Sequence, residues 1–521
     1  MKNDKKIRQK IVSTVIFSLL LVFSPLNISA SQHEGTSSEN AEELPTTGFE
    51  DRGGDGWTTL EEELAFLEEL AERSDRVSFT EEGTSVEGRP IYLVRVGFPK
   101  PPTDEEIASG RNILIMGTPH GNEPAGREMT LKLMRDLAFT DDPELLDQLE
   151  DATIMFVPTP NPDGRKANQR RNAQNIDNNR DHLNLNTPEI QTIAKIMNQF
   201  QPDITVDAHE RPRATGNPDI EFLWPRNLNV DEPLRSLNIE LVQDYMRPDL
   251  EAVGYSTGLY GTPGGAGGGD ERILRNMSGL RHGLGILTES AGSQEPNDRV
   301  DMQMHAAESV LRFYRERFDD VVMVVTEAPE RKAVTGEDSS NPYYLDGADN
   351  WDPSDEGVLE TQPSGYLLHT SQLEEIGRHL ELFSIKTEKI SDQLIFVPMN
   401  QAMMTVIPPL FDERAPYNEI NGLALYDFEN PGSVTNMKTL VAYFDTEEGA
   451  FVDESDVRSL QTHLTAVSQY EEKGLGEKVI KHMEGFKQLL HNQKENRSIS
   501  ENAYTDLQTY TDYIIEKWEH D

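Results

Sequence analysis

Cysteine is absent from the 521 residues of the chain. A secreted protein without cysteine has no disulfides, and it carries no lipid attached to a cysteine. The hydrophobic core and bound ions must therefore stabilise the folded state. The chain is long enough for two or three domains with a large core.

Basic residues are scarce relative to acidic ones. The chain has 48 lysines and arginines against 92 aspartates and glutamates, which gives a net charge of −44 at pH 7. This excess repels phosphates, so it argues against nucleic acid or an anionic membrane as a partner. Because salt screens the self-repulsion of such a surface, a salt-rich habitat is one explanation for the charge.

Long apolar runs are lacking outside the N-terminus. Five basic residues in the first ten precede the apolar run at residues 11–23, and the small residues Ser29 and Ala30 follow it. This pattern is typical of a secretory signal peptide at residues 1–30. The run is short for a membrane span, and no second run of spanning length follows. We therefore predict a secreted, extracellular protein with no stable membrane insertion after cleavage; an uncleaved N-terminal anchor is the alternative.

The order of the segments after this leader predicts an α/β fold. Residues 31–56 are polar and rich in Ser, Glu, Gly and Thr, which is typical of a flexible spacer. Over residues 57–325, short apolar runs alternate with amphipathic helical segments, two of which begin with a proline, at residues 124–137 and 188–200. The apolar runs are residues 91–96, 113–116, 153–157, 204–208 and 285–287. This alternation predicts a mixed, mostly parallel central sheet with helices on both faces.

Two further parts follow this domain. Residues 326–450 begin with an acidic, loop-like stretch and continue with apolar runs around a helical segment at residues 371–382, which predicts a small α/β-like accessory region. Residues 451–521 show a charged helical pattern, which predicts a C-terminal module of two or three helices. We expect this module to pack on the rest of the chain or to contact a cell wall or another protein, and to have no catalytic role.

Residues suited to metal binding and acid–base chemistry follow the apolar runs. His120 and Glu123 come after one run, Asn-Pro-Asp-Gly at residues 161–164 after the next, His209 ends another, and Glu289 ends the last. Because ligands bind at the carboxyl ends of strands in open α/β sheets, we expect these residues to meet at one rim. Two imidazoles and one carboxylate are the ligand set of a catalytic zinc ion, which keeps a fourth position open. The sequence therefore predicts a zinc-dependent hydrolase.

These residues also carry a resemblance to a known family. The His-x-x-Glu pair at residues 120–123, the distant His209 and the stretch Leu-Thr-Glu at residues 287–289 resemble the zinc carboxypeptidases, or metallocarboxypeptidases. Residues 83–89 and 161–164 match further hallmarks of that family. The resemblance covers the whole predicted α/β domain. It implies a zinc carboxypeptidase-like fold in a secreted bacterial member that carries a C-terminal extension.

The resemblance implies the roles of four residues at the metal. His120, Glu123 and His209 would bind one zinc ion per catalytic domain. Glu289 would act as the general base, because a carboxylate near zinc can take the proton of an activated water and then deliver it to the leaving amine.

The resemblance also implies a set of substrate contacts. Arg170 corresponds best to the arginine that polarises the scissile carbonyl, with Arg171 as the alternative. Asn179 and Arg180 would bind the terminal carboxylate of the substrate, since arginine binds a carboxylate through two parallel hydrogen bonds.

A glycine-rich stretch beginning at Tyr260 resembles the mobile loop whose tyrosine closes over the bound peptide end, with Tyr255 as the alternative tyrosine. Asp270 and Glu271 lie near the segment that lines the side-chain pocket in the family. An acidic floor there would favour a C-terminal Lys or Arg through charge complementarity.

The sequence thus predicts a secreted zinc metallocarboxypeptidase that hydrolyses the C-terminal bonds of peptides or proteins. Within enzymes, the alternative is a cell-wall peptide amidase or carboxypeptidase that acts on muropeptides. A non-catalytic binding module that retains the peptidase fold is a further alternative, although such a module would usually have lost part of the ligand and base set. A structural surface protein built around the acidic helical tail is the third.

Overall fold

The structure is a computed structural model, and it describes residues 44–212, 217–261, 268–347, 357–390, 392, 394–426, 432–446 and 449–520. The predicted signal peptide and residues 31–43 of the predicted spacer lie outside the described residues. Residues from Pro45 onward form one compact unit. Among the helices of the described part, none is both long and apolar enough to cross a membrane.

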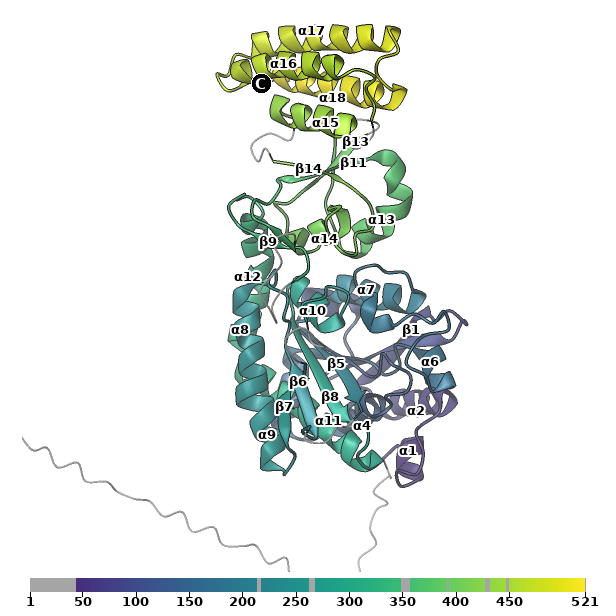
Figure 1. Cartoon of the computed structure of the whole chain (residues 1–521). Helices are drawn as coiled ribbons and strands as arrows, with labels where there is room; N and C mark the ends of the chain where they lie inside the picture. The colour runs from purple at the N-terminus through teal and green to yellow at the C-terminus, as the bar shows by residue number, and fades with distance from the viewer. Residues whose placement is uncertain are drawn as a thin grey trace, which may run out of the picture. The chain divides into compact units, whose positions relative to one another are not determined.

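An eight-stranded sheet forms the centre of the α/β domain, in the order β1-β2-β4-β3-β5-β8-β6-β7. Figure 1 labels β1, β5, β6, β7 and β8 of this sheet. Parallel pairing joins β3 to β4, β3 to β5, β5 to β8 and β6 to β7, whereas β1–β2, β2–β4 and β6–β8 are antiparallel. The strands are β1 (Val77–Thr84), β2 (Pro90–Val96), β3 (Asn112–Met116), β4 (Thr153–Val157), β5 (Ile204–Arg211), β6 (Ile220–Leu223), β7 (Thr257–Leu259) and β8 (Leu284–Ala291). The predicted mixed, mostly parallel sheet is confirmed.

Helices cover both faces of this sheet because its central strands are apolar on both sides. In β3, Ile113 and Ile115 pack into one core, and Leu114 and Met116 pack into a second core on the other face. The first core includes side chains of α2, α4 and α11, and the second includes side chains of α3, α7 and α10. The helical segments are α1 (Gly48–Asp51), α2 (Leu60–Arg73), α3 (Asp104–Ser109), α4 (Ala125–Phe139), α5 (Pro143–Asp151), α6 (Pro162–Ala167), the short 3₁₀ turn η1 (Asn178–Arg180), α7 (Pro188–Phe200), α8 (Glu232–Glu240), the π-helical η2 (Leu241–Met246), α9 (Arg247–Ala252), α10 (Leu274–Leu280), α11 (Pro296–Glu316) and α12 (Phe318–Thr335).

The end of the predicted spacer is folded, so that prediction is wrong for the residues from 44 onward. Thr47 and Glu50 form a reciprocal capping box that starts α1. Phe49 is 2% exposed, and its ring stacks on Trp57 at 4.9 Å between centroids. A single buried aromatic residue therefore anchors a segment whose average composition is that of a linker.

The predicted boundary between residues 325 and 326 falls inside α12, so it does not separate two folded parts. The accessory region that follows contains a four-stranded sheet in the order β12-β13-β11-β14. Its elements are β9 (Tyr343–Tyr344), β10 (Val358–Leu359), β11 (Gly365–His369), η4 (Thr370–Gln372), α13 (Leu373–Leu382), β12 (Glu388–Lys389), β13 (Leu394–Pro398), η5 (Ala402–Thr405), α14 (Ile407–Phe411) and β14 (Leu423–Leu425).

The C-terminal helical module begins earlier than the predicted residue 451. It comprises α15 (Val434–Thr446), α16 (Glu454–Glu471), α17 (Gly476–Glu495) and α18 (Glu501–His520), which lie together in Figure 1. Met437 and Val441 of α15 are fully buried in the same core as Leu464 of α16 and Phe486 of α17. The sequence analysis missed α15 because the break in charge pattern comes after it, whereas the shared core includes it.

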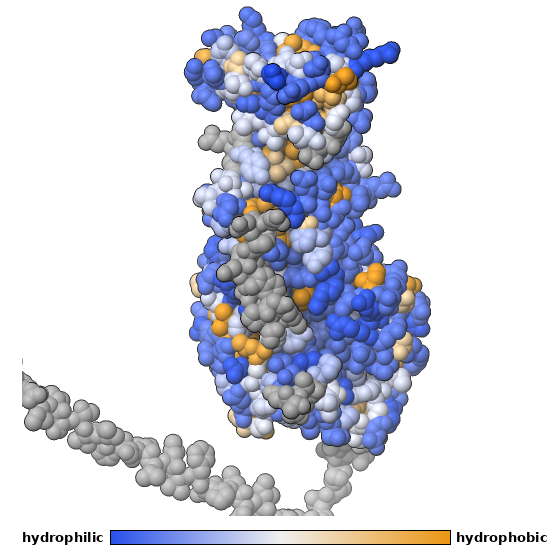
Figure 2. Space-filling view, viewed as in Figure 1, coloured by the Kyte–Doolittle hydropathy of each residue, from blue (hydrophilic) through white to orange (hydrophobic). Residues whose placement is uncertain are grey.

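Few of the carboxylates in the described residues are buried. Figure 2 shows a face made mostly of hydrophilic residues, with apolar side chains in small scattered areas. Several buried carboxylates have charged partners, which offset the cost of burying them in a low-dielectric interior: Glu63 lies 2.6 Å from Arg127, and Asp203 lies 3.0 Å from Arg111.

Candidate zinc centre and catalytic site

The loop after β3 carries the first two predicted ligands. His120 and Glu123 are 2% and 7% exposed, and they precede α4, whose N-cap is Pro124. Gly121 lies so close to Gly164 of α6 that an added Cβ would come within 1.8 Å of its carbonyl carbon. Glycine is therefore required in this loop, and the Asn-Pro-Asp-Gly turn acts as the surface against which the ligand loop packs.

His209 completes the ligand set from β5, the strand next to β3. It lies within the strand rather than at its end, because β5 continues to Arg211. Glu123 Oε2 lies 3.0 Å from His120 Nδ1 and 3.0 Å from His209 Nδ1, and the two Nδ1 atoms are 3.1 Å apart. The structure thus brings the three predicted ligands together, with their ligand atoms all within 4.8 Å of one another.

The outer nitrogens of both histidines face carboxylates. His120 Nε2 lies 3.0 Å from Asp177 Oδ1, and His209 Nε2 lies 3.0 Å from Asp207 Oδ1. Carboxylates in this position fix the ring tautomer and raise the basicity of the nitrogen that faces the metal. Two buried imidazoles so oriented, together with Glu123, fit a catalytic zinc ion and leave a fourth position open.

Positive charge dominates the electrostatics of Glu123. Burial alone would raise the pKa of this carboxyl, but the imidazoles of His120 and His209 hold the pKa well below its usual range. Glu123 is therefore ionised, as a metal ligand must be. The pKa of Asp177 is also held far below its usual range, because His120, Arg170 and Arg180 outweigh the effect of burial.

Glu289 lies on β8 directly beside His209 on β5. Burial raises its pKa to about 8, and the negative charges of Glu123 and Asp207 add to this effect while His209 and Arg211 oppose it. Its Oε2 atom is buried, without a hydrogen-bond partner among the described residues. A carboxylate with a high proton affinity and an unsatisfied oxygen next to the ligand set is chemically suited to accept a proton there.

The structure distinguishes the two candidate arginines. Arg170 Nη1 donates to Glu123 Oε1 at 3.2 Å, and Arg170 Nε donates to Asp177 Oδ2 at 2.9 Å. Arg171 instead donates to the backbone oxygen of Asn175 at 2.8 Å. Arg170 is therefore the arginine at the ligand set, and its half-exposed side chain can face a substrate.

Asn179 and Arg180 lie in η1, next to His209. Asn179 Nδ2 donates to Asp207 Oδ2 at 3.0 Å and lies 2.8 Å from His209 Nε2, while its Oδ1 accepts from the backbone nitrogen of Leu274. Arg180 Nη1 donates to the backbone oxygen of Asn179 at 2.6 Å. Both amide atoms of Asn179 are thus engaged within the protein, a placement that its motif did not indicate.

Tyr260 follows β7 and faces the same groups. Burial raises its pKa to about 12, with a further contribution from the carboxylate of Glu289, while Arg180, Arg275 and Arg170 oppose the shift. The alternative Tyr255 has other charged neighbours, namely Asp298, Asp301 and Asp219. The glycine-rich stretch at residues 262–267 lies outside the described residues.

Asp270 and Glu271 do not present a pair of open negative charges. Arg272 neutralises Asp270 through two hydrogen bonds of 3.0 and 2.8 Å. Glu271 is 1% exposed, and burial together with the nearby Asp270 and Asp346 raises its pKa to about 8. At neutral pH this carboxyl is mostly protonated, so it adds little negative charge to the region.

The accessory region braces the loop that follows Arg180. Asn184 Nδ2 donates to Glu419 Oε1 at 2.5 Å and to the backbone oxygen of Tyr417 at 3.0 Å. His379 Nε2 lies 3.0 Å from the backbone oxygen of Asn184. The sequence analysis assigned no contact between the two parts, because nothing in the local pattern of either segment marks a partner more than two hundred residues away.

The sequence analysis also missed the role of Asp207. A signal was present, because residues two apart on a strand point to the same face, which places Asp207 beside His209. Gln303 of α11 was missed as well; its Nε2 donates to the backbone oxygen of His209 at 2.8 Å and helps to fix the strand.

In sequence, this chain is similar to carboxypeptidases of other organisms. Residues 63–211 match the zinc carboxypeptidase family model, and residues 434–516 match the FIMAH domain. Carboxypeptidase 2 of Trichophyton rubrum is 29% identical over 391 residues, covering 66% of this chain and 71% of that protein. Carboxypeptidase E of Caenorhabditis elegans is 32% identical over 139 residues, covering 24% and 29%. A crystal structure of a putative carboxypeptidase A from Shewanella denitrificans matches with a TM-score of 0.42 and 22% identity, over 50% of this chain and 70% of that one.

Proposed function

We propose that the chain, whose residues 63–211 match the zinc carboxypeptidase family model, is a secreted metallocarboxypeptidase that removes residues from the free C-terminus of peptides. One observation carries the proposal: the three zinc ligands, a buried carboxylate without a partner and an arginine meet at a single point. The basic and apolar N-terminal leader supports secretion.

The residues divide the work of hydrolysis. His120, Glu123 and His209 would hold zinc, which when bound lowers the pKa of a coordinated water and polarises a carbonyl. Glu289 takes the proton of the attacking water and delivers it to the leaving amine. Arg170 stabilises the negative charge that develops on the carbonyl oxygen.

Arg180 and Asn179 are proposed to bind the terminal carboxylate, with Tyr260 closing over the peptide end. Arg180 supplies the positive charge and the paired donors. A direct contact from Asn179 requires its amide to exchange the bond to Asp207 for one to the substrate, because both of its amide atoms are engaged. We propose this exchange as part of substrate binding.

The test is a panel of peptides and muropeptides with free C-termini, incubated with and without a chelator. We expect release of C-terminal amino acids only when zinc is present. Glu289→Gln should lower kcat by about a hundredfold to ten-thousandfold, the usual contribution of a general base, while zinc content stays unchanged. Equal hydrolysis in the presence of chelator would contradict the zinc mechanism, and hydrolysis of muropeptides alone would favour the cell-wall alternative.

Matched variants test the substrate contacts. Arg170→Ala should lower kcat/KM, whereas Arg171→Ala should leave it unchanged, because Arg171 faces away from the ligand set. Arg180→Ala should raise KM for free peptides, and amidated peptides should be poor substrates of both proteins. Faster hydrolysis of amidated than of free peptides would contradict the carboxylate contact.

Secretion has its own test. Protein collected from the culture medium is expected to begin just after Ala30. An N-terminus that still contains residues 1–30 would support the uncleaved anchor instead.

A further inference from the structure

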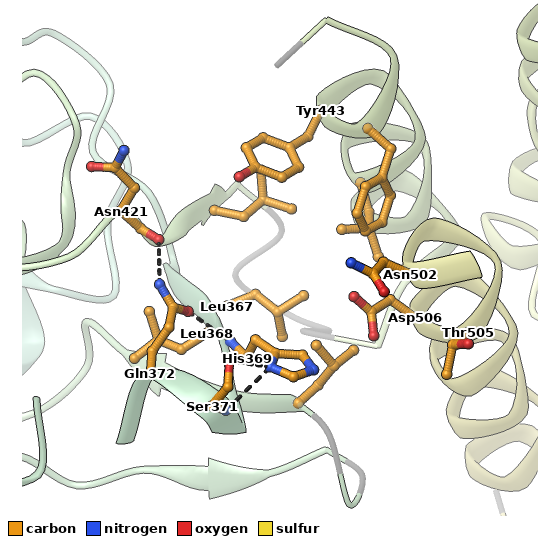
Figure 3. A pocket seen from close by; sticks show the side chains of 14 residues that line it. Leu367, Leu368, His369, Ser371, Gln372, Asn421, Tyr443, Asn502, Thr505 and Asp506 are labelled. Carbon is orange, nitrogen blue, oxygen red and sulfur yellow. Dashed lines mark hydrogen bonds between the residues drawn. The ribbon is translucent and has the colours of Figure 1, made fainter. Parts of the chain in front are cut away.

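A second cavity lies far along the chain from the zinc ligands, between the accessory sheet and the helical module. Its volume is about 480 Å³, which is within the range of small-molecule sites. The floor is apolar and includes Leu367 and Leu394 of the sheet and Leu440 of α15. Polar side chains from both parts line the rest of it and are labelled in Figure 3: His369, Ser371, Gln372, Asn421, Tyr443, Asn502, Thr505 and Asp506.

The lining is poor in charge for a chain of this composition. No lysine or arginine lines the cavity, and Asp506 is its one acidic residue. Phosphates and other anions would find no cationic partner there. Among the described residues, the zinc ligands are the one group of three or more histidines and acids placed to hold a metal ion, and none of them lines this cavity.

The polar groups instead suit a ligand rich in hydroxyls. The side-chain amides of Asn421 and Asn502 can each both donate and accept. Gln372 instead holds the wall together, because its Nε2 donates to the backbone oxygen of Asn421 at 3.1 Å and its Oε1 accepts from the backbone nitrogen of His369 at 2.9 Å. His369 Nδ1 accepts from the backbone nitrogen of Ser371 at 3.1 Å, so the proton of the neutral ring is on Nε2, which is then a donor. Tyr443 adds an aromatic ring with a polar end, a surface on which the C–H face of a sugar ring can stack.

A neighbouring cavity extends this site. It has a volume of about 460 Å³ and shares Asn421, Leu423 and Tyr443 with the first. Its other lining includes Tyr426, a second tyrosine, which is 43% exposed, and the charged residues Asp412, Glu413 and Arg414. Arg414 pairs with Asp412 at 2.9 Å, so its positive charge is already neutralised within the protein. The two cavities adjoin at the three residues that they share. An elongated ligand of several linked units therefore fits them better than a single compact molecule.

We propose that this pair of cavities binds a neutral oligosaccharide. The ligand contacts both the accessory sheet and the helical module, so binding stabilises their association. The site is separate from the zinc centre and acts as an anchor: it retains the protein on a glycan-bearing surface. The proposal stands independently of the reaction at the zinc ligands.

The experiment uses the full chain and calorimetric titration with three neutral tetrasaccharides: chitotetraose, cellotetraose and maltotetraose. We expect at least one to bind, and Tyr443→Ala and Asn502→Ala to weaken that binding about tenfold or more, which corresponds to about 1.4 kcal/mol. Tyr470→Ala is the matched control, because Tyr470 stacks on His482 in the same module and does not line either cavity. It should bind as the unmodified protein does.

Each variant is also tested for hydrolysis of a C-terminal peptide substrate and for thermal unfolding. These two measurements distinguish loss of the sugar site from loss of the fold. Asn502 is exposed, so Asn502→Ala is expected to leave the core intact. Weaker binding by this variant, together with unchanged hydrolysis and unchanged thermal unfolding, supports the proposal. Failure of all three tetrasaccharides to bind at millimolar concentration overturns it. So does equal weakening by Tyr470→Ala, or tighter binding of an oligogalacturonate or a tetrapeptide than of the neutral sugars.

Discussion

Replacing Glu271 by glutamine should stabilise the protein, and the gain should grow with pH. Glu271 is 1% exposed, and its pKa is raised to about 8 by burial and by the neighbouring Asp270 and Asp346. Asn227 Nδ2 donates to it from 3.4 Å, which is a long contact that offsets little of the cost of burying the charge. Glutamine has the same shape and no charge, so the substitution removes the titration and preserves the packing.

The sign and size follow from linkage. The folded state holds the proton of Glu271 up to a pH of about 8, whereas the unfolded chain releases it near the ordinary value of 4.5. The stability linked to this group is therefore fully present below pH 4.5 and is lost as the pH rises to about 8. The difference of about 3.5 pH units corresponds to about 5 kcal/mol, at 1.36 kcal/mol for each unit.

The assay is the free energy of unfolding of the α/β domain for Glu271→Gln and the unmodified protein at several pH values between about 5 and 8.5. Other buried carboxyls titrate equally in both proteins, so the difference isolates Glu271. Glu105→Gln on exposed α3 is the matched control and should show no growing difference. A difference that stays constant across this range would refute the reasoning that Glu271 is protonated in the folded state.

Four further outcomes are expected. Asp207→Asn should weaken zinc affinity about tenfold to a hundredfold in a chelator competition, because this carboxylate orients His209. Glu419→Ala removes a bond to the loop after Arg180, so KM for free peptides should rise while kcat stays constant. Phe486→Ala should cost about 3–5 kcal/mol by emptying part of the helical core, visible by calorimetry, without changing hydrolysis. Substrates ending in arginine and in leucine should be hydrolysed with similar kcat/KM, since the charges of Asp270 and Glu271 are largely cancelled.

The centre of the sheet and the meeting of the ligands could be predicted from the sequence. The runs at β3 and β4 are almost wholly apolar because both faces of these strands are buried, and β5 alternates apolar with polar residues up to His209, so all three are visible without any partner information. Once they are neighbours in a parallel arrangement, their following residues must meet at one edge. His120 and His209 therefore come together even though 88 residues separate them.

The edges of the sheet could not be predicted in the same way. β1 is half exposed and carries Glu81 and Glu82, while β6 and β7 have four and three residues. β1 lacks a continuous apolar pattern because it is half exposed, whereas β6 is largely buried but, like β7, is too short for its pattern to distinguish a strand from a loop. The extension of β8 past Glu289 escaped notice for a different reason. The residues there are buried between the neighbouring strands β5 and β6, but Ser290 is polar and does not continue the apolar run.

The segment from Arg170 to Arg180 contacts both histidines of the ligand set, so it links the separate motifs of this site. Asp177 contacts both His120 and Arg170, so one carboxylate orients a metal ligand and the arginine proposed to stabilise the oxyanion. Asn179 contacts both Asp207 and His209, so the segment proposed to bind the substrate is joined to the second histidine as well. A change in the position of this segment must therefore alter the metal ligands and the substrate contacts together. Because the accessory region binds the next residues of the same loop through Asn184, we expect it to influence the proposed substrate contacts through this segment rather than through a group of its own at the metal ligands.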